Sequence, residues 1–123
     1  MNELVLIADD DEDILQLVSV HLRRLGCSVV VARDGAAALS LALERRPALA
    51  LIDVTMPKLD GIEVTRLLRS AEETRGLPVI LLSARVQEAD VARGLEAGAD
   101  GYLAKPLAGS ELRERVAAVL RKR

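Results

Sequence analysis

Residues 4–11 have the sequence Leu-Val-Leu-Ile-Ala-Asp-Asp-Asp, and this stretch decides the fold. Its apolar residues do not alternate with polar ones, as expected of a strand that is buried on both faces. Consecutive carboxylates follow where the strand must end. This arrangement predicts a parallel sheet with covered faces and with polar groups along its carboxyl edge.

The rest of the chain repeats this unit of a short apolar run and a longer amphipathic stretch. Strands are predicted at residues 4–8, 28–32, 48–53, 78–82 and 101–104. Helices are predicted near residues 13–25, 36–46, 62–71, 87–97 and 110–121. Strict alternation favours an α/β fold with a parallel sheet, because parallel neighbours are joined by helical crossovers. Five strands are too few for an eight-stranded barrel, so we expect an open, doubly wound sheet with helices on both faces.

Composition bounds the class of protein. The 123 residues are 50% hydrophobic and 29% charged, which predicts a single domain over residues 1–123. Lys and Arg number 17 against 19 Asp and Glu, so no basic excess indicates direct contact with nucleic acid or membrane. Cys27 is the only cysteine, and no basic leader or long apolar run occurs. We therefore expect a soluble cytoplasmic protein.

Polar side chains follow four of the predicted strands. They are Asp9, Asp10 and Asp11 after the first, Asp53 after the third, Ser83 after the fourth and Lys105 after the fifth. Carboxyl ends of parallel strands meet at one edge, so these groups are expected to converge. Clustered carboxylates repel one another unless a cation lies among them, and an all-oxygen ligand set favours Mg²⁺, with Mn²⁺ as an alternative. An aspartate there could act as a nucleophile toward a phosphoryl group.

Four stretches in order carry a resemblance to a known family. They are Leu6-Ile7-Ala8-Asp9-Asp10-Asp11, residues 51–61 (Leu-Ile-Asp-Val-Thr-Met-Pro-Lys-Leu-Asp-Gly), Leu82-Ser83-Ala84, and residues 98–106 (Gly-Ala-Asp-Gly-Tyr-Leu-Ala-Lys-Pro). Together they resemble the receiver domains of two-component response regulators, over essentially the whole chain. The resemblance implies a flavodoxin-like sheet with strand order 2-1-3-4-5.

The resemblance implies an acceptor and a metal site. Asp53 would be the phosphoacceptor and a metal ligand. Asp10 would bind Mg²⁺ directly, Asp9 would act largely through metal-bound water, and Thr55 would contribute its backbone carbonyl. The domain would assist its own phosphorylation and dephosphorylation without being an enzyme in the ordinary sense.

The resemblance also implies a switch. Lys105 would contact the phosphoryl group, Ser83 would bind it, and Tyr102 would move inward as Ser83 does so. Thr55 and Arg85 match positions that influence phosphoryl lifetime in the family. The peptide bond between Lys105 and Pro106 matches one that is often cis.

The implied partners are a sensor histidine kinase or phosphotransfer protein, which donates the phosphoryl group, and an output protein or linked output domain. Because the sequence stops at Arg123, we expect a stand-alone regulator or the receiver portion of a longer protein. A dimer through the fourth helix, fifth strand and fifth helix is a further expectation. Asp100, Glu111 and Arg115 resemble charged residues that pair there, whereas Val91 and Gly101 replace residues that are often charged.

Three other hypotheses compete. A phosphohydrolase of the haloacid dehalogenase type would need Asp-x-Asp, where the chain has Asp53-Val54-Thr55. A flavodoxin-like electron carrier would need a loop that accepts flavin phosphate, and residues 9–11 are acidic. A constitutive interaction domain would not need the acid, hydroxyl and lysine groups.

Several polar residues have ordinary structural explanations. Asp11, Asp34 and Asp60 are predicted to cap helices. His21, in the middle of a predicted helix, and Cys27 are expected to pack rather than to react.

Overall fold

The chain forms one five-stranded parallel sheet in the order β2-β1-β3-β4-β5. The computed structural model describes residues 2–122. The strands are β1 (Leu4–Ala8), β2 (Ser28–Ala32), β3 (Leu49–Asp53), β4 (Val79–Ser83) and β5 (Gly101–Ala104). The helices are α1 (Glu12–Arg24), α2 (Gly35–Arg45), α3 (Gly61–Ser70), α4 (Glu88–Glu96) and α5 (Gly109–Arg121). The predicted α/β fold and strand order are confirmed. Strand β3 starts at Leu49 rather than Ala48, and β4 covers residues 79–83 rather than 78–82.

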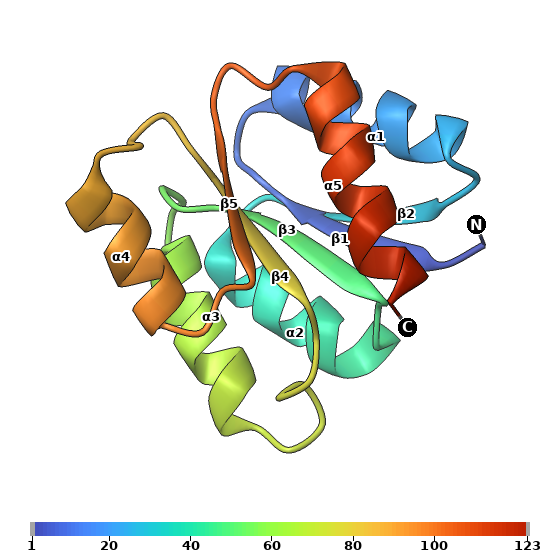
Figure 1. Cartoon of the computed structure of the whole chain (residues 1–123). Helices are drawn as coiled ribbons and strands as arrows, with labels where there is room; N and C mark the ends of the chain where they lie inside the picture. The colour runs from blue at the N-terminus through green and yellow to red at the C-terminus, as the bar shows by residue number, and fades with distance from the viewer. Residues whose placement is uncertain (1, 123) are drawn as a thin grey trace.

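Helices cover both faces of the sheet, as Figure 1 shows. Helices α1 and α5 pack on one face, and α2, α3 and α4 lie on the other. Successive residues of β1 point to opposite faces of the sheet. Leu6 and Ala8 pack in the core on the α2 and α3 face, whereas Val5 and Ile7 pack in the core on the α1 and α5 face. Burial on both faces is why these strands are continuously apolar.

Side-chain caps define where three helices begin. Asp11, Asp34 and Asp60 are the N-caps of α1, α2 and α3, and each carboxylate accepts a hydrogen bond from a backbone N–H in the first turn. These three capping predictions are therefore confirmed. Gly26, just beyond α1, has a φ of 85°, a conformation that suits glycine and ends the helix.

The helical repeat predicts that Ile14, Val18, Leu22 and Leu25 share the buried face of α1, and the buried face in the structure differs from this by one position. Val18 and Leu22 are buried as expected, but Leu15 replaces Ile14 as the third buried apolar residue. Ile14 and Leu25 are half-buried at the margin of the core. The 3.6-residue repeat identifies the helix reliably, whereas the centre of its apolar stripe depends on the tilt of the helix against the sheet.

Gly94 has a packing role that explains its presence inside α4. A Cβ atom there would lie 2.8 Å from Cδ1 of Leu81 and 3.2 Å from the ring of Tyr102. Glycine therefore lets α4 approach β4 and β5 closely. It also lowers helix propensity by about 1 kcal/mol relative to alanine, and Gln87 at the N-cap makes no side-chain capping bond. These features give α4 little local stabilisation.

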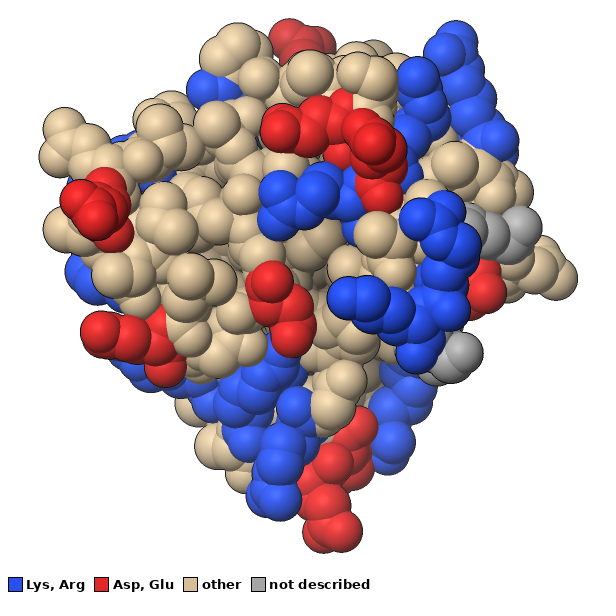
Figure 2. Space-filling model, in the orientation of Figure 1, with Lys and Arg blue, Asp and Glu red and all other residues tan. Residues whose placement is uncertain are grey.

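The visible surface carries interspersed charges. Figure 2 shows Lys and Arg side chains beside Asp and Glu side chains, with uncharged areas between them. None of the helices in residues 2–122 combines the length and apolar character needed to cross a membrane.

Candidate functional site

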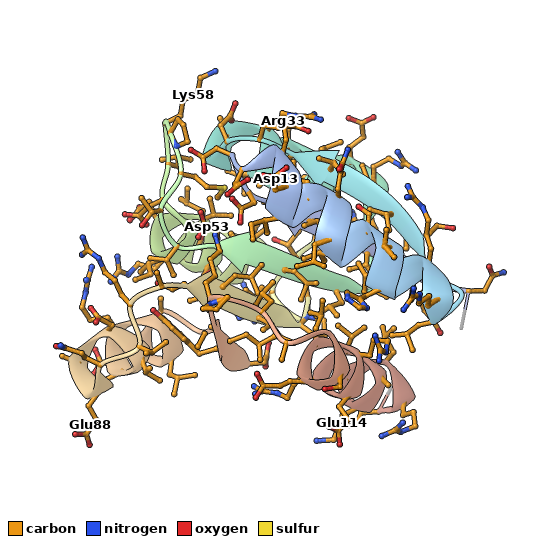
Figure 3. The ribbon with its side chains drawn as sticks, turned by 90° about the horizontal axis from the view of Figure 1, so that it is seen from above. Asp13, Arg33, Asp53, Lys58, Glu88 and Glu114 are labelled. Carbon is orange, nitrogen blue, oxygen red and sulfur yellow. The ribbon has the colours of Figure 1, made fainter. Side chains whose placement is uncertain are left out.

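The polar strand ends converge on one cavity at the carboxyl edge of the sheet. The cavity has a volume of about 290 Å³. It is lined by Asp9, Asp10, Asp11, Asp53, Thr55, Ser83, Ala84, Arg85 and Lys105. Figure 3 shows Asp53 at this end of the sheet, on the same side as Asp13 at the start of α1. The fold thus brings together every site residue expected from the sequence except Tyr102.

Three carboxylates form the floor of the cavity. Oxygen atoms of Asp9, Asp10 and Asp53 lie within 4.8 Å of one another. Asp9 and Asp53 are buried, whereas Asp10 is exposed to solvent. Asp9 accepts two hydrogen bonds, one at Oδ1 from the backbone N–H of Asp11 at 3.0 Å and one at Oδ2 from Lys105 at 2.8 Å. Asp9 is therefore held firmly, while the Asp10 side of the cluster remains open to water.

Lys105 links two of these carboxylates. Its Nζ atom lies 2.8 Å from Oδ2 of Asp9 and 3.2 Å from Oδ1 of Asp53. Burial alone would lower the pKa of Lys105, but its hydrogen bonds and ion pairs with the two aspartates outweigh that effect and raise the pKa. Lys105 therefore stays charged and offsets part of the negative charge.

Asp53 is the carboxyl whose protonation is most perturbed. Burial, reinforced by the negative charge of Asp9, raises its pKa from the ordinary value of 3.8 to about 6. Lys105 and a hydrogen bond from the backbone of Thr55 act in the opposite direction. A carboxyl that is this costly to ionise gains from an added cation, because the cation favours its charged form.

The donor set suits a hard divalent cation. The three aspartates supply only oxygen atoms, which are the ligands that Mg²⁺ and Mn²⁺ prefer. When all groups are ionised, three carboxylates and the Lys105 ammonium give the cluster a formal charge of −2. One divalent ion would neutralise it. Exposure of Asp10 also leaves room for the water molecules that Mg²⁺ commonly retains.

Gly61, which no sequence pattern predicted as a site residue, lets α3 begin directly behind Asp53. A Cβ atom on Gly61 would overlap the carbonyl oxygen of Asp53 and lie 2.9 Å from its carbonyl carbon. The Gly61 N–H donates to the carbonyl of Val54 at 2.8 Å, and the Thr65 hydroxyl donates to the Gly61 carbonyl at 2.8 Å. These contacts fix the backbone that carries Asp53.

Ser83 and Tyr102 both contact the backbone of Arg85. The buried hydroxyl of Ser83 accepts from the Arg85 N–H at 2.9 Å, and the Tyr102 hydroxyl donates to the Arg85 carbonyl at 2.6 Å. Tyr102 lies outside the cavity, half-buried against α4. The backbone of Arg85 therefore connects Ser83, which lines the cavity, with Tyr102, the only aromatic residue of the sequence.

The other polar residues occupy structural positions. His21 accepts a hydrogen bond at Nδ1 from Arg113 at 2.6 Å and packs against Gly109, between α1 and α5. Cys27 is buried in the core. The Lys105–Pro106 peptide bond is cis, as expected.

Comparisons with known proteins identify the family of the chain. The family described as "Response regulator receiver domain" matches residues 5–117. The transcriptional regulatory protein PhoP of Bacillus subtilis, named for alkaline phosphatase synthesis, is 43% identical over 122 residues, which is 99% of this chain and 50% of that protein.

Solved structures give the same result. The receiver domain of the Francisella response regulator 1452 is 37% identical, with a TM-score of 0.91 over 98% of both chains. The receiver domain of the sensor histidine kinase PA1611 of Pseudomonas aeruginosa, with magnesium coordinated in its active-site cleft, is 31% identical, with a TM-score of 0.90 over 98% of this chain and 99% of that one.

The chain belongs to the receiver domains of response regulators. It is thus a signalling domain of two-component systems, a family in which an aspartate is phosphorylated with the help of Mg²⁺. This membership removes the dehalogenase-type and flavodoxin-like hypotheses. The chain spans about half the length of the curated relatives that it matches.

Proposed function

We propose that Asp53 is the phosphoacceptor and that its phosphorylation switches the conformation of this domain. One observation carries the proposal: Asp53 is buried and lines a cavity together with Asp10 and Lys105. Of the other two carboxylates, Asp9 accepts hydrogen bonds at both of its oxygens and Asp10 is exposed to solvent. The donor would be the phosphohistidine of a sensor kinase or of a phosphotransfer protein.

The proposed transfer uses the charged groups of the cavity. An Oδ atom of Asp53 attacks phosphorus, the bond from phosphorus to the histidine nitrogen breaks, and the imidazole leaves with that electron pair. Lys105 neutralises phosphoryl oxygens as charge shifts among them. Mg²⁺, or Mn²⁺, would be held by Asp10, Asp53 and the Thr55 carbonyl, with Asp9 acting through water, and would supply further charge stabilisation. Magnesium in the PA1611 receiver domain supports this assignment.

The proposed switch passes through Ser83. When its hydroxyl donates to the new phosphoryl group, the Ser83 Oγ contact with the Arg85 N–H changes, and with it the position of the carbonyl that holds Tyr102. Tyr102 then turns inward. The hydrogen bond from Ser83 to the phosphoryl group exists only in the phosphorylated state, so it can shift the conformational equilibrium. Thr55 and Arg85, at the mouth of the cavity, would set how fast water removes the phosphoryl group.

We also propose how the domain is used. Residues 1–123 would form one receiver unit in the cytoplasm, acting on an output protein or on a linked output domain. The length of PhoP, about twice that of this chain, and its name as a transcriptional regulatory protein support the linked form.

Dimerisation through α4, β5 and α5 is a separate proposal. On this face Asp100 is already engaged within the chain, because Arg69 Nη2 lies 3.0 Å from its Oδ2 and the Val79 N–H donates to the same atom. Arg115 lies over Gly101. Pairing in a dimer would therefore have to share the Asp100 carboxylate, and sedimentation with and without beryllium fluoride measures whether it does.

Intact mass after incubation with acetyl phosphate tests the acceptor. One added phosphoryl group that requires both Mg²⁺ and Asp53 is expected, and Asp53→Asn is the matched control. Phosphorylation of Asp53→Asn would show that another residue is the acceptor. If the wild-type protein gains no mass and beryllium fluoride with Mg²⁺ leaves its amide spectrum unchanged, the domain works by constitutive binding instead.

A further inference from the structure

A second cavity adjoins the acceptor cavity. It also has a volume of about 290 Å³, and both cavities are lined by Thr55 and Arg85. The remaining lining residues are Val54, Met56, Asp60, Ile62 and Arg93. The two cavities therefore adjoin at Thr55 and Arg85, and α3 and α4 contribute residues to the walls of the second one.

The walls of this second cavity combine apolar and cationic groups. Val54, Met56 and Ile62 form an apolar part. Arg85 and Arg93 add two guanidinium groups, and neither makes an ion pair with any residue in the described range 2–122. The one carboxylate in the wall, that of Asp60, accepts from the Glu63 N–H at 2.8 Å as the cap of α3. Such walls suit a small ligand with an apolar body and a negative charge.

We propose that this second cavity receives the acyl group of small acyl phosphates and that Arg93 determines the preference for them. The inference rests on the proposed function of Asp53. With the phosphoryl group beside Asp53, the acyl group of the donor would lie beyond Thr55, with its carbon atoms against Met56 and Ile62 and its carboxyl oxygens toward the guanidinium groups.

The arginines act on the leaving group in this step. Asp53 Oδ attacks phosphorus, the bond between phosphorus and the acyl oxygen breaks, and the carboxylate departs with the electron pair. No proton is needed, because acetate is stable as an anion. Negative charge grows on the departing carboxylate as the bond breaks, and a nearby guanidinium stabilises that charge more than it stabilises the intact donor.

Comparing two phosphodonors separates the proposed effect of Arg93 on the acyl group from effects on phosphoryl transfer itself. Acetyl phosphate carries an acyl group, whereas phosphoramidate loses ammonia and has none. We expect Arg93→Ala to lower the ratio of the acetyl phosphate rate to the phosphoramidate rate about fivefold, the size of effect typical of one exposed charge interaction. Arg45→Ala is the matched control, since Arg45 is exposed in the last turn of α2 and lines neither cavity. An unchanged ratio in Arg93→Ala overturns the inference.

A binding measurement tests the same idea without turnover. In the Asp53→Asn protein with Mg²⁺, acetyl phosphate should shift the amide signals of residues at both cavities, including Met56 and Arg93. Inorganic phosphate should shift only those of the acceptor cavity. Identical shifts with both anions would overturn the acyl site and leave the acceptor assignment intact. Failure of the wild-type protein to react with either donor would overturn both proposals.

Discussion

The ammonium group of Lys105 lies 3.2 Å from Oδ1 of Asp53, although β4 lies between the strands that precede these residues. Lys105 reaches across that strand because it follows β5 in a loop above the sheet edge, and its second contact is with Asp9 after β1. One side chain thus ties together residues that follow three strands. The cation takes up part of the negative charge that a metal would otherwise neutralise alone.

Replacing Lys105 by alanine should separate the charge neutralisation by Lys105 from the neutralisation by a bound metal ion. Without metal, Lys105→Ala should destabilise the protein by about 1–3 kcal/mol, because two buried carboxylates lose their partner. Mg²⁺ should bind more tightly, since no competing cation remains. Chemical denaturation and Mg²⁺ titration measure the two effects. Lys58→Ala is the control, because exposed Lys58 forms an ion pair with Asp34 at 3.7 Å, away from the cavity. Weaker Mg²⁺ binding in Lys105→Ala would contradict this account.

The raised pKa of Asp53 predicts how stability depends on pH in Mg²⁺-free buffer. Its pKa is about 6 in the folded protein, above the ordinary 3.8, so the folded state binds this proton more tightly. The contribution of Asp53 is therefore fully present below pH 3.8 and is lost as pH rises through about 6. Asp53→Asn should remove that loss. The difference in unfolding free energy between the two proteins, measured from pH 4 to 8, should grow with pH; a constant difference would disprove the shift.

His21 should give the opposite pH dependence. Burial, followed by the charges of Arg113 and Arg24, lowers the pKa of His21 below 6.5. Folding thus favours neutral His21, and its contribution is present above pH 6.5 and is lost as pH falls below that value. His21→Gln keeps a polar side chain without the titration, so its acid-side loss of stability should be smaller. The comparison of His21 with His21→Gln is made in the Asp53→Asn protein, because this removes the titration of Asp53 from the same pH range. Equal acid sensitivity would rule out a role for His21.

Close packing behind Asp53 predicts a strong effect of one methyl group. Gly61→Ala should cost about 3 kcal/mol of stability, because the new Cβ overlaps the backbone of Asp53 and overpacking is destabilising. It should also weaken Mg²⁺ binding by moving Asp53. Gly76→Ala is the matched control, since a Cβ atom there has no neighbour within 4 Å. Thermal unfolding and Mg²⁺ titration compare them, and equal behaviour would show that the α3 contact is soft.

Removing the Tyr102 hydroxyl tests whether its hydrogen bond to Arg85 stabilises the outward position of the ring. Tyr102→Phe loses the 2.6 Å bond to the Arg85 carbonyl. Because that bond is exposed, the stability cost should be about 0.5 kcal/mol. Beryllium fluoride with Mg²⁺ should then bind about twofold more tightly, since the outward position has lost a stabilising contact. Calorimetric titration measures this, and weaker binding would mean that the hydroxyl serves the inward state.

The fold was predictable because its signals are local. Uninterrupted apolar runs such as residues 4–8 and the capping aspartates each depend on near neighbours in the sequence, and the strand order followed from the family resemblance. The position of Ile14 was not predicted correctly. It is half-buried and Leu15 is buried in its place, because the tilt of α1 depends on the whole sheet.

The site was predictable only in part. Convergence of Asp9, Asp53 and Lys105 follows from the rule for carboxyl edges, but the contacts of Gly61 and the place of Arg93 do not. Arg93 lines the second cavity, and the neighbouring Gly94 lets α4 lie close to the sheet. The distance between α4 and the sheet is set by packing, and the sequence around Arg93 has no pattern that predicts it.

The position of β5 as the last strand along the chain has a consequence for biosynthesis. Strand β5 and the loop after it supply Tyr102 and Lys105, and they leave the ribosome after Asp53. Until they dock, a nascent chain has the proposed acceptor, Asp53, but neither Lys105 beside it nor Tyr102. The proposed acceptor site is therefore complete only after the last strand has docked, and on the proposed function a partly made chain would accept phosphoryl groups poorly.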